Sequence, residues 1–163
     1  MSNTPLILKM AAYEQESVHR VNHFMKVYAF AKTIGEGEGL DPETRHILET
    51  AAIVHDIGIK PAMEKYGTGA GPYQEKEGPA VAEAMLAELG YSKAVIDRVC
   101  FLVGHHHTYT DIDGPDYQIL VEADFLVNIH EGNMPIDRIR EVEKNIFRTA
   151  TGLALLRTMF LQG

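Results

Sequence analysis

The stretch Ile53-Val54-His55-Asp56-Ile57-Gly58 places a histidine and an aspartate side by side at the end of an apolar run. Adjacent residues on a helix point about 100° apart, so both side chains can reach one point only if the helix ends there. Gly58 is a typical residue for such an end. Imidazole and carboxylate both bind divalent metals, and polar groups among alanine, isoleucine and valine need a partner. The alternative is a helix-end histidine beside a solvated carboxylate. Further candidate ligands elsewhere in the chain are needed to distinguish a metal site from this alternative.

The composition indicates one globular domain. The chain has 163 residues, of which 45% are hydrophobic, enough for a single domain over residues 1–163 with a sizeable core. A single cysteine, Cys100, excludes an internal disulfide framework. The start of the chain has only the short apolar run Leu6-Ile7-Leu8, too little for a signal peptide, and no run approaches membrane-spanning length. We therefore expect a soluble cytoplasmic protein without a membrane partner.

The charge of the chain is acidic. Fifteen Lys and Arg residues stand against 23 Asp and Glu residues, which gives a net charge of -8 at pH 7. This charge argues against binding to a nucleic-acid polymer through its backbone. An anionic substrate would have to be attracted by metal ions and a few local lysines.

Helical periodicity runs through the whole chain, and no segment has the pattern of a strand. Asp41 and Pro42 supply an N-cap and a first-turn proline for one helix, and Pro115 and Pro135 open two others. The expected helices span about residues 14–34, 42–54, 78–89, 92–106, from 115 onward, and 135–161. The pattern predicts an all-α fold, a single compact bundle of about six helices.

The connection between residues 59 and 77 is long for a compact domain and contains a glycine-rich segment at 67–71. Connections of this length are usually functional or disordered loops. A phosphate-binding loop is not indicated, because no strand precedes the glycines and no Gly-Lys-Ser or Gly-Lys-Thr follows them. We expect a mobile lid.

Two further segments supply candidate metal ligands. His19 and His23 are four residues apart on a predicted helix, which places them on one face, although both could be half-exposed surface histidines. Asp124 lies on an apolar stripe with Leu120 and Val127, where an ionised carboxylate is costly without a cation. The alternative is an ion pair between Asp124 and an arginine such as Arg98.

Three consecutive histidines, His105, His106 and His107, end the predicted helix that begins at Ser92. At most two of the three can face one cavity, and cationic histidines also suit a helix C-terminus. Cys100 lies on the apolar part of the same helix and is a core residue rather than a ligand.

In order, these segments resemble the HD-domain superfamily (HDIG type) of metal-dependent phosphohydrolases. The likeness extends over about residues 19–131 and is followed by the expected helix at 135–161. His23-Phe24-Met25-Lys26-Val27 is similar to the first-ligand motif, residues 52–58 to the central motif, and Glu122-Ala123-Asp124-Phe125-Leu126 to the closing motif. The resemblance implies a primary metal site of His23, His55, Asp56 and Asp124.

A second metal site is less completely matched. Dinuclear relatives carry a further histidine at a position that resembles Gln74 here, and glutamine is a poor ligand for transition metals. Glu75 or Glu77 could substitute for it. The resemblance offers His105, His106 and His19 as possible second-site ligands. We expect one divalent ion (Fe, Mn, Co, Ni or Zn) and allow for a second. The Gly-Tyr-Pro extension of the cyclic-dinucleotide branch is absent.

The implied chemistry is hydrolysis of a small phosphorylated metabolite or nucleotide by metal-activated water. Asp56 would hold the metal and orient the water. Lys60 and Lys26 are candidates for binding the phosphate, although each could be an ordinary surface lysine. Glu77 is a candidate general acid or base, with a helix first-turn acid as the alternative.

Two other functions remain open from the sequence. Some HD proteins use a di-iron site for oxygen-dependent cleavage, which the glutamine at position 74 disfavours. Others are signalling or binding modules with weak catalysis. The presence of all four primary ligands argues against a binding module, because a scaffold has no physical need for them.

Overall fold

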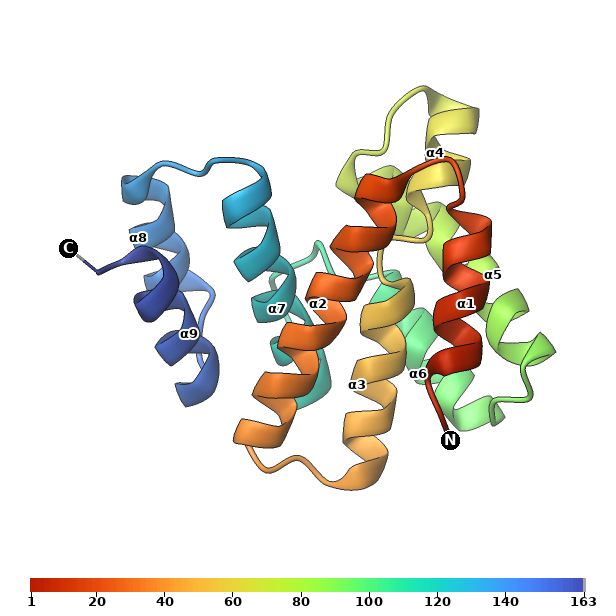
Figure 1. The fold of residues 1–163 in the computed structure, drawn as a ribbon, viewed down its shortest axis with the longest axis horizontal. Helices are drawn as coiled ribbons and strands as arrows, with labels where there is room; N and C mark the ends of the chain where they lie inside the picture. The colour runs from red at the N-terminus through yellow and green to blue at the C-terminus, as the bar shows by residue number, and fades with distance from the viewer. Residues whose placement is uncertain (163) are drawn as a thin grey trace.

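Nine helices make up residues 1–162, the part of the chain that the computed structural model describes, and this part contains no strand (Figure 1). The predicted all-α fold is confirmed, but the number of helices exceeds the expected six. None of these helices is long and apolar enough to span a membrane. In chain order they are α1 (Thr4–Tyr13), α2 (Val18–Gly37), α3 (Pro42–Val54), α4 (Ile59–Tyr66), α5 (Gly71–Glu88), α6 (Lys93–Val103), α7 (Pro115–Glu131), α8 (Ile136–Asn145) and α9 (Ala150–Phe160).

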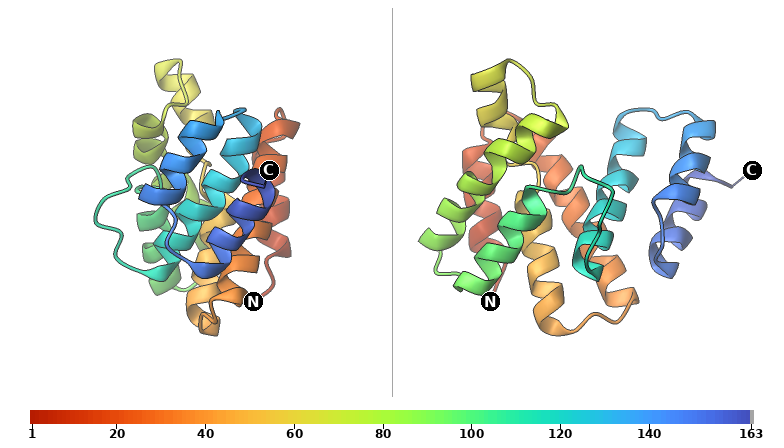
Figure 2. Two further views of the ribbon diagram at one scale, coloured as in Figure 1. Left: turned by 90° about the vertical axis from the view of Figure 1, so that its left-hand side faces the viewer. Right: turned by 180° about the vertical axis from the view of Figure 1, so that it is seen from behind.

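Helix α2 lies between α3 and α7, and these three helices pack against one another at the centre of the molecule (Figure 1). One face of α2 is fully buried because its apolar residues recur at steps of three and four. These residues are Phe24, Val27, Ala31 and Ile34. Helix α6 packs against α3, α5 packs against α6, and α8 and α9 lie beyond α7 (Figure 2). The central helices α2, α3 and α7 therefore form the core of the fold.

The N-terminal segment forms a helix that the sequence pattern did not indicate. Helix α1 contributes only two fully buried apolar side chains, Leu6 and Met10, which lie four residues apart. They pack into the common core, with α1 against α3 and α5. A single apolar pair is a weak periodic signal, and tertiary packing stabilises this helix.

The expected lid between residues 59 and 77 is largely helical. Helix α4 occupies Ile59–Tyr66 and ends at Gly67, whose φ of +72° is the left-handed conformation that favours glycine at a helix end. Helix α5 starts at Gly71, seven residues before the expected start at residue 78. The connection without helix is therefore only residues 67–70. The prediction of a long loop was wrong, because the segment forms the helix α4 and the start of α5.

The expected helix from 135 to 161 is interrupted. Helix α8 ends at Asn145 and α9 begins at Ala150, with the Thr149 hydroxyl accepting a hydrogen bond from the Gly152 backbone N–H. The fully buried carboxylate of Glu122 on α7 accepts hydrogen bonds from the backbone N–H groups of Arg148 (3.0 Å) and Thr149 (3.1 Å). These N–H groups cannot also bond within a continuous helix, so Glu122 fixes the break.

Glu122→Ala should lower the free energy of unfolding by about 2–4 kcal/mol, because it leaves several buried donors without an acceptor. One of these donors is the Thr149 hydroxyl, at 2.6 Å from Glu122 Oε1. Urea denaturation followed by circular dichroism measures the change. The control is Glu88→Ala, which removes an exposed carboxylate paired with Lys9 and should change stability by less than about 0.5 kcal/mol. Equal effects of the two substitutions would contradict this role of Glu122.

Candidate metal centre

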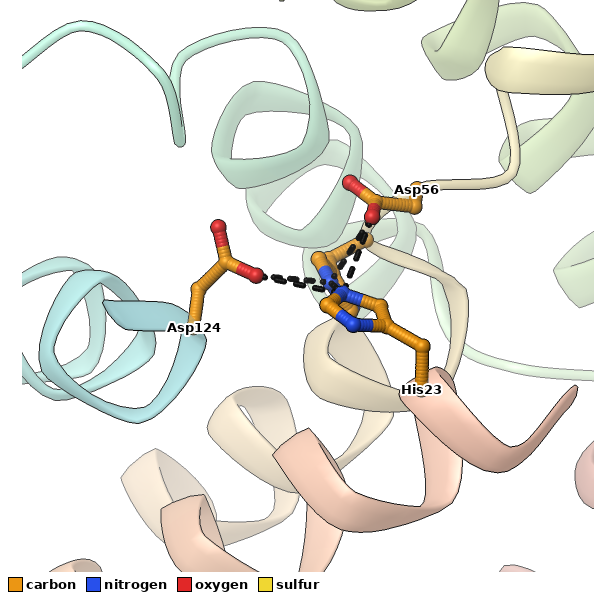
Figure 3. A group of neighbouring side chains, drawn as sticks. His23, Asp56 and Asp124 are labelled. Carbon is orange, nitrogen blue, oxygen red and sulfur yellow. Dashed lines mark hydrogen bonds and ion pairs between the residues drawn. The ribbon is translucent and has the colours of Figure 1, made fainter. Parts of the chain in front are cut away.

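Three elements bring four polar side chains to one buried point. His23 comes from α2 and Asp124 from α7, whereas His55 and Asp56 follow directly after the end of α3 at Val54. The turn from His55 to Gly58 lets adjacent residues face the same point, as the sequence predicted. Figure 3 shows Asp56 and Asp124 pointing toward the His23 ring from two sides. All four residues are buried.

These four residues, His23, His55, Asp56 and Asp124, could together hold a metal ion, and we call them the first ligand group. His23 Nε2 lies 3.0 Å from Asp56 Oδ2, 3.2 Å from Asp124 Oδ1 and 3.1 Å from His55 Nε2. His55 Nε2 lies 3.4 Å from Asp56 Oδ2 and 3.3 Å from Asp124 Oδ1. Two imidazole nitrogens and two carboxylate oxygens thus converge, which is a donor set that suits a divalent transition metal.

The hydrogen bonding around these atoms fits a cation. The His55 ring donates from Nδ1 to the Ala52 carbonyl (2.7 Å), so in the neutral ring the lone pair on Nε2 would face the group. Asp124 Oδ1 is buried and has no hydrogen-bond partner. A buried carboxylate oxygen beside two imidazole nitrogens is costly unless a positive charge, from a metal ion or from protonated rings, lies between them. Arg98 does not supply that charge, because it pairs with Asp113 and Asp116.

A second ligand group, Asp56, His106 and His107, adjoins the first. Asp56 Oδ1 lies 2.9 Å from His106 Nε2 and 3.7 Å from His107 Nε2. The His106 ring donates from Nδ1 to the Val103 carbonyl (2.9 Å), which turns its Nε2 inward, toward Asp56. His107 Nε2 is buried without a hydrogen-bond partner. The two oxygens of Asp56 therefore face different groups.

The loop that carries His106 and His107 is held from two sides. The Glu75 carboxylate accepts hydrogen bonds from the His107 backbone N–H (3.1 Å) and the Thr108 hydroxyl (3.1 Å). The buried Tyr117 hydroxyl contacts the carbonyls of His105 (2.7 Å) and Thr108. Glu75 is thereby engaged with the backbone of this loop and lies outside both ligand groups.

Two histidines proposed for a second site lie outside both groups. The His105 ring stacks on Phe101, with centroids 4.1 Å apart, and bonds through Nδ1 to the Phe101 carbonyl. The His19 side chain is 77% exposed, and its nearest carboxylate is that of Glu131, at 4.0 Å. His107 takes the place expected for His105. The sequence limited the cavity to two of the three histidines, but the turn after Val103 decides which two.

Gln74 is buried, and its side-chain amide donates to the Gly69 carbonyl (3.2 Å), while its Oε1 has no partner. Gly58 is required beside it, because a Cβ atom at Gly58 would collide with the Gln74 carbonyl and lie 2.7 Å from Gly78 N. This close approach packs the first turns of α5 directly against the turn that carries Asp56.

The other predicted site residues have partners elsewhere. Glu77 lies outside both groups and accepts from Lys65 Nζ (2.6 Å) and the Tyr66 hydroxyl (2.9 Å). These hydrogen bonds lower the pKa of Glu77, which disfavours it as a general acid. Lys60 Nζ donates to the Tyr13 carbonyl (3.1 Å), and Lys26 Nζ lies 3.4 Å from Glu131 Oε2.

The protonation of the first group reflects its two carboxylates. Burial lowers the pKa of His23, but the Asp124 and Asp56 carboxylates outweigh burial and raise it to about 11. Burial and the same two carboxylates compete at His55, whose pKa is raised to about 9. Burial works against ionisation of Asp124, but the neighbouring histidines hold its pKa below the usual range. Without a metal, therefore, protons supply the positive charge that the carboxylates need.

Affinity for Mn²⁺ should rise as the pH increases from about 6 to about 8, because the ion must displace protons that the metal-free site holds. These protons are on His23 and His55, whose pKa values of about 11 and about 9 lie above this range. Isothermal titration calorimetry in buffers of different ionisation enthalpy counts the protons released. An affinity that does not change with pH, without proton release, would contradict the assignment.

The comparisons with known proteins bear on the family. The family model described as HD domain matches residues 20–144, a range that contains both ligand groups. Searches of curated proteins and of solved structures returned no match. The match covers more than half of the chain and confirms the resemblance found in the sequence. The chain belongs to the HD domain family.

Proposed function

We propose that this protein is a metal-dependent phosphohydrolase that acts on a small phosphorylated metabolite or nucleotide. The observation that carries the proposal is the position of Asp56, whose Oδ2 faces the first ligand group and whose Oδ1 faces the second. One carboxylate between two clusters of imidazoles can bridge two cations, an arrangement that suits phosphoryl transfer. Family membership supports the proposal, because HD domains are commonly metal-dependent hydrolases.

The first group would hold the tighter ion, of Fe, Mn, Co, Ni or Zn. Its two carboxylates, Asp56 and Asp124, balance the charge of one divalent cation, and His23 and His55 supply two neutral nitrogen ligands. The second group offers three donors, one of them shared, and Gln74 occupies the position at which the family resemblance implies a further histidine ligand. A second ion would therefore bind more weakly.

When bound, a divalent ion at such a site lowers the pKa of water and offsets negative charge on phosphoryl oxygens. Asp56 lies between the two groups and would accept a hydrogen bond from the attacking water, which orients it. Burial lowers the pKa of His106, which favours the neutral ring that a metal ligand requires. Phosphate binding by Lys60 and Lys26 stays a prediction. Each lysine would first have to leave its present partner.

Asp56→Ala should lower hydrolysis of phosphate esters by more than about 100-fold and abolish metal retention, because the substitution removes a ligand from both groups. A panel of nucleotides and phosphomonoesters, with elemental analysis of the purified protein, gives both readouts. The helical content should stay unchanged. The matched control is Asp97→Ala, an exposed aspartate paired with Lys93. Full activity in Asp56→Ala, or oxygen consumption without phosphate release by the iron-loaded wild type, would overturn the proposal.

His107→Ala should weaken only the weaker ion, because His107 belongs to the second group alone. His105→Ala is the matched control, since the neighbouring His105 ring packs on Phe101 instead. Titration with Mn²⁺ followed by electron paramagnetic resonance should show the second binding event lost or weakened in the first variant and kept in the control. If His105→Ala weakens the second ion instead, the second group is misassigned.

A further inference from the structure

The side chain of Glu131 adjoins the first ligand group from the outer side of His23. Glu131 is the last residue of α7 and follows Asp124 by seven residues, which is two helical turns and returns to the same face. Its side chain is 13% exposed. Helices α2 and α7 pack against each other (Figure 1), so one face of α7 presents both carboxylates to α2.

Glu131 contacts the nitrogen of His23 that does not face the ligand group. Its Oε1 lies 2.8 Å from His23 Nδ1, while His23 Nε2 lies 3.0 Å from Asp56 Oδ2. A carboxylate can only accept, so the contact requires a proton on Nδ1. In the neutral ring the lone pair is then on Nε2, which is the tautomer that a ligand of the first group needs.

The acceptor for His23 differs in kind from those of the other inward-facing rings. His55 and His106 donate from Nδ1 to main-chain carbonyls, those of Ala52 and Val103. A charged acceptor withdraws more of the N–H proton than a carbonyl does, which makes the opposite nitrogen a stronger base and a stronger ligand. A side-chain acceptor can also be removed by substitution, whereas a carbonyl cannot.

We propose that Glu131 is a positioning residue that fixes the tautomer and the orientation of His23 and thereby strengthens metal binding by the first ligand group. The proposal rests on the proposed metal centre, and it assigns to α7 two functions at that centre. Asp124 acts as a ligand, and Glu131, two turns later, orients a ligand from the neighbouring helix. Lys26 Nζ, at 3.4 Å from Glu131 Oε2, helps to hold the carboxylate in place.

The test measures the dissociation constant of Co²⁺ by competition with a chromophoric chelator. Glu131→Ala removes the acceptor and should weaken Co²⁺ binding by about 10- to 100-fold, the usual effect of losing such a partner. Glu131→Gln keeps an acceptor oxygen without its charge and should lie between the wild type and Glu131→Ala. The control is Glu143→Gln, which neutralises a carboxylate bonded to Arg157 (2.6 Å) and should bind Co²⁺ as the wild type does.

Melting temperatures measured with chelator separate positioning from a structural role. A positioning role predicts weaker Co²⁺ binding while the metal-free melting temperature of Glu131→Gln stays near that of the wild type. Co²⁺ affinities equal to the wild type in both Glu131 variants would overturn the inference and leave the proposed function intact. A wild type that binds no Co²⁺ would overturn both. If Glu131→Ala does not fold, the Co²⁺ dissociation constant of Glu131→Gln alone tests the inference.

Discussion

The structure depends on two buried carboxylates, Asp56 and Asp124, which lie on two sides of His23 inside a helical bundle. Burying two negative charges near each other is unfavourable unless a cation lies between them. These side chains come from three different elements. The turn after α3 carries Asp56, α7 carries Asp124, and α2 places His23 between them. Packing of these three helices would therefore favour binding of a cation, and a bound cation would in turn stabilise the packing.

Much of the fold could be predicted from the sequence, because strong signals mark α2, α3 and α7. The Asp41-Pro42 cap and the apolar stripe that contains Asp124 are local patterns that survive in the structure. The remaining errors have tertiary causes. Helix α1 depends on two side chains buried against other helices, and the break before α9 depends on Glu122, which is distant in sequence. No local pattern contains either constraint.

The first ligand group could be proposed from the sequence because each member carries its own signal, whether a motif or a charge on an apolar stripe. The second could be proposed only in part. Three adjacent histidines give no sign of which ring turns inward, and the loop after α6 selects His106 and His107 through contacts with Glu75 and Tyr117. The role of Glu131 could not be predicted from the sequence, because an acidic residue at a helix end is usually an ordinary surface residue. Only its contact with His23 in the structure distinguishes it.

The central claim is that the first ligand group holds a divalent cation, and diffraction from crystals grown with Mn²⁺ tests it most directly. Data collected on both sides of the manganese absorption edge locate the ion independently of the protein atoms. The account predicts an anomalous peak among His23 Nε2, His55 Nε2, Asp56 Oδ2 and Asp124 Oδ1, at about 2.0–2.3 Å from each atom. The absence of a peak there at saturating Mn²⁺, or a peak only elsewhere on the protein, would contradict it.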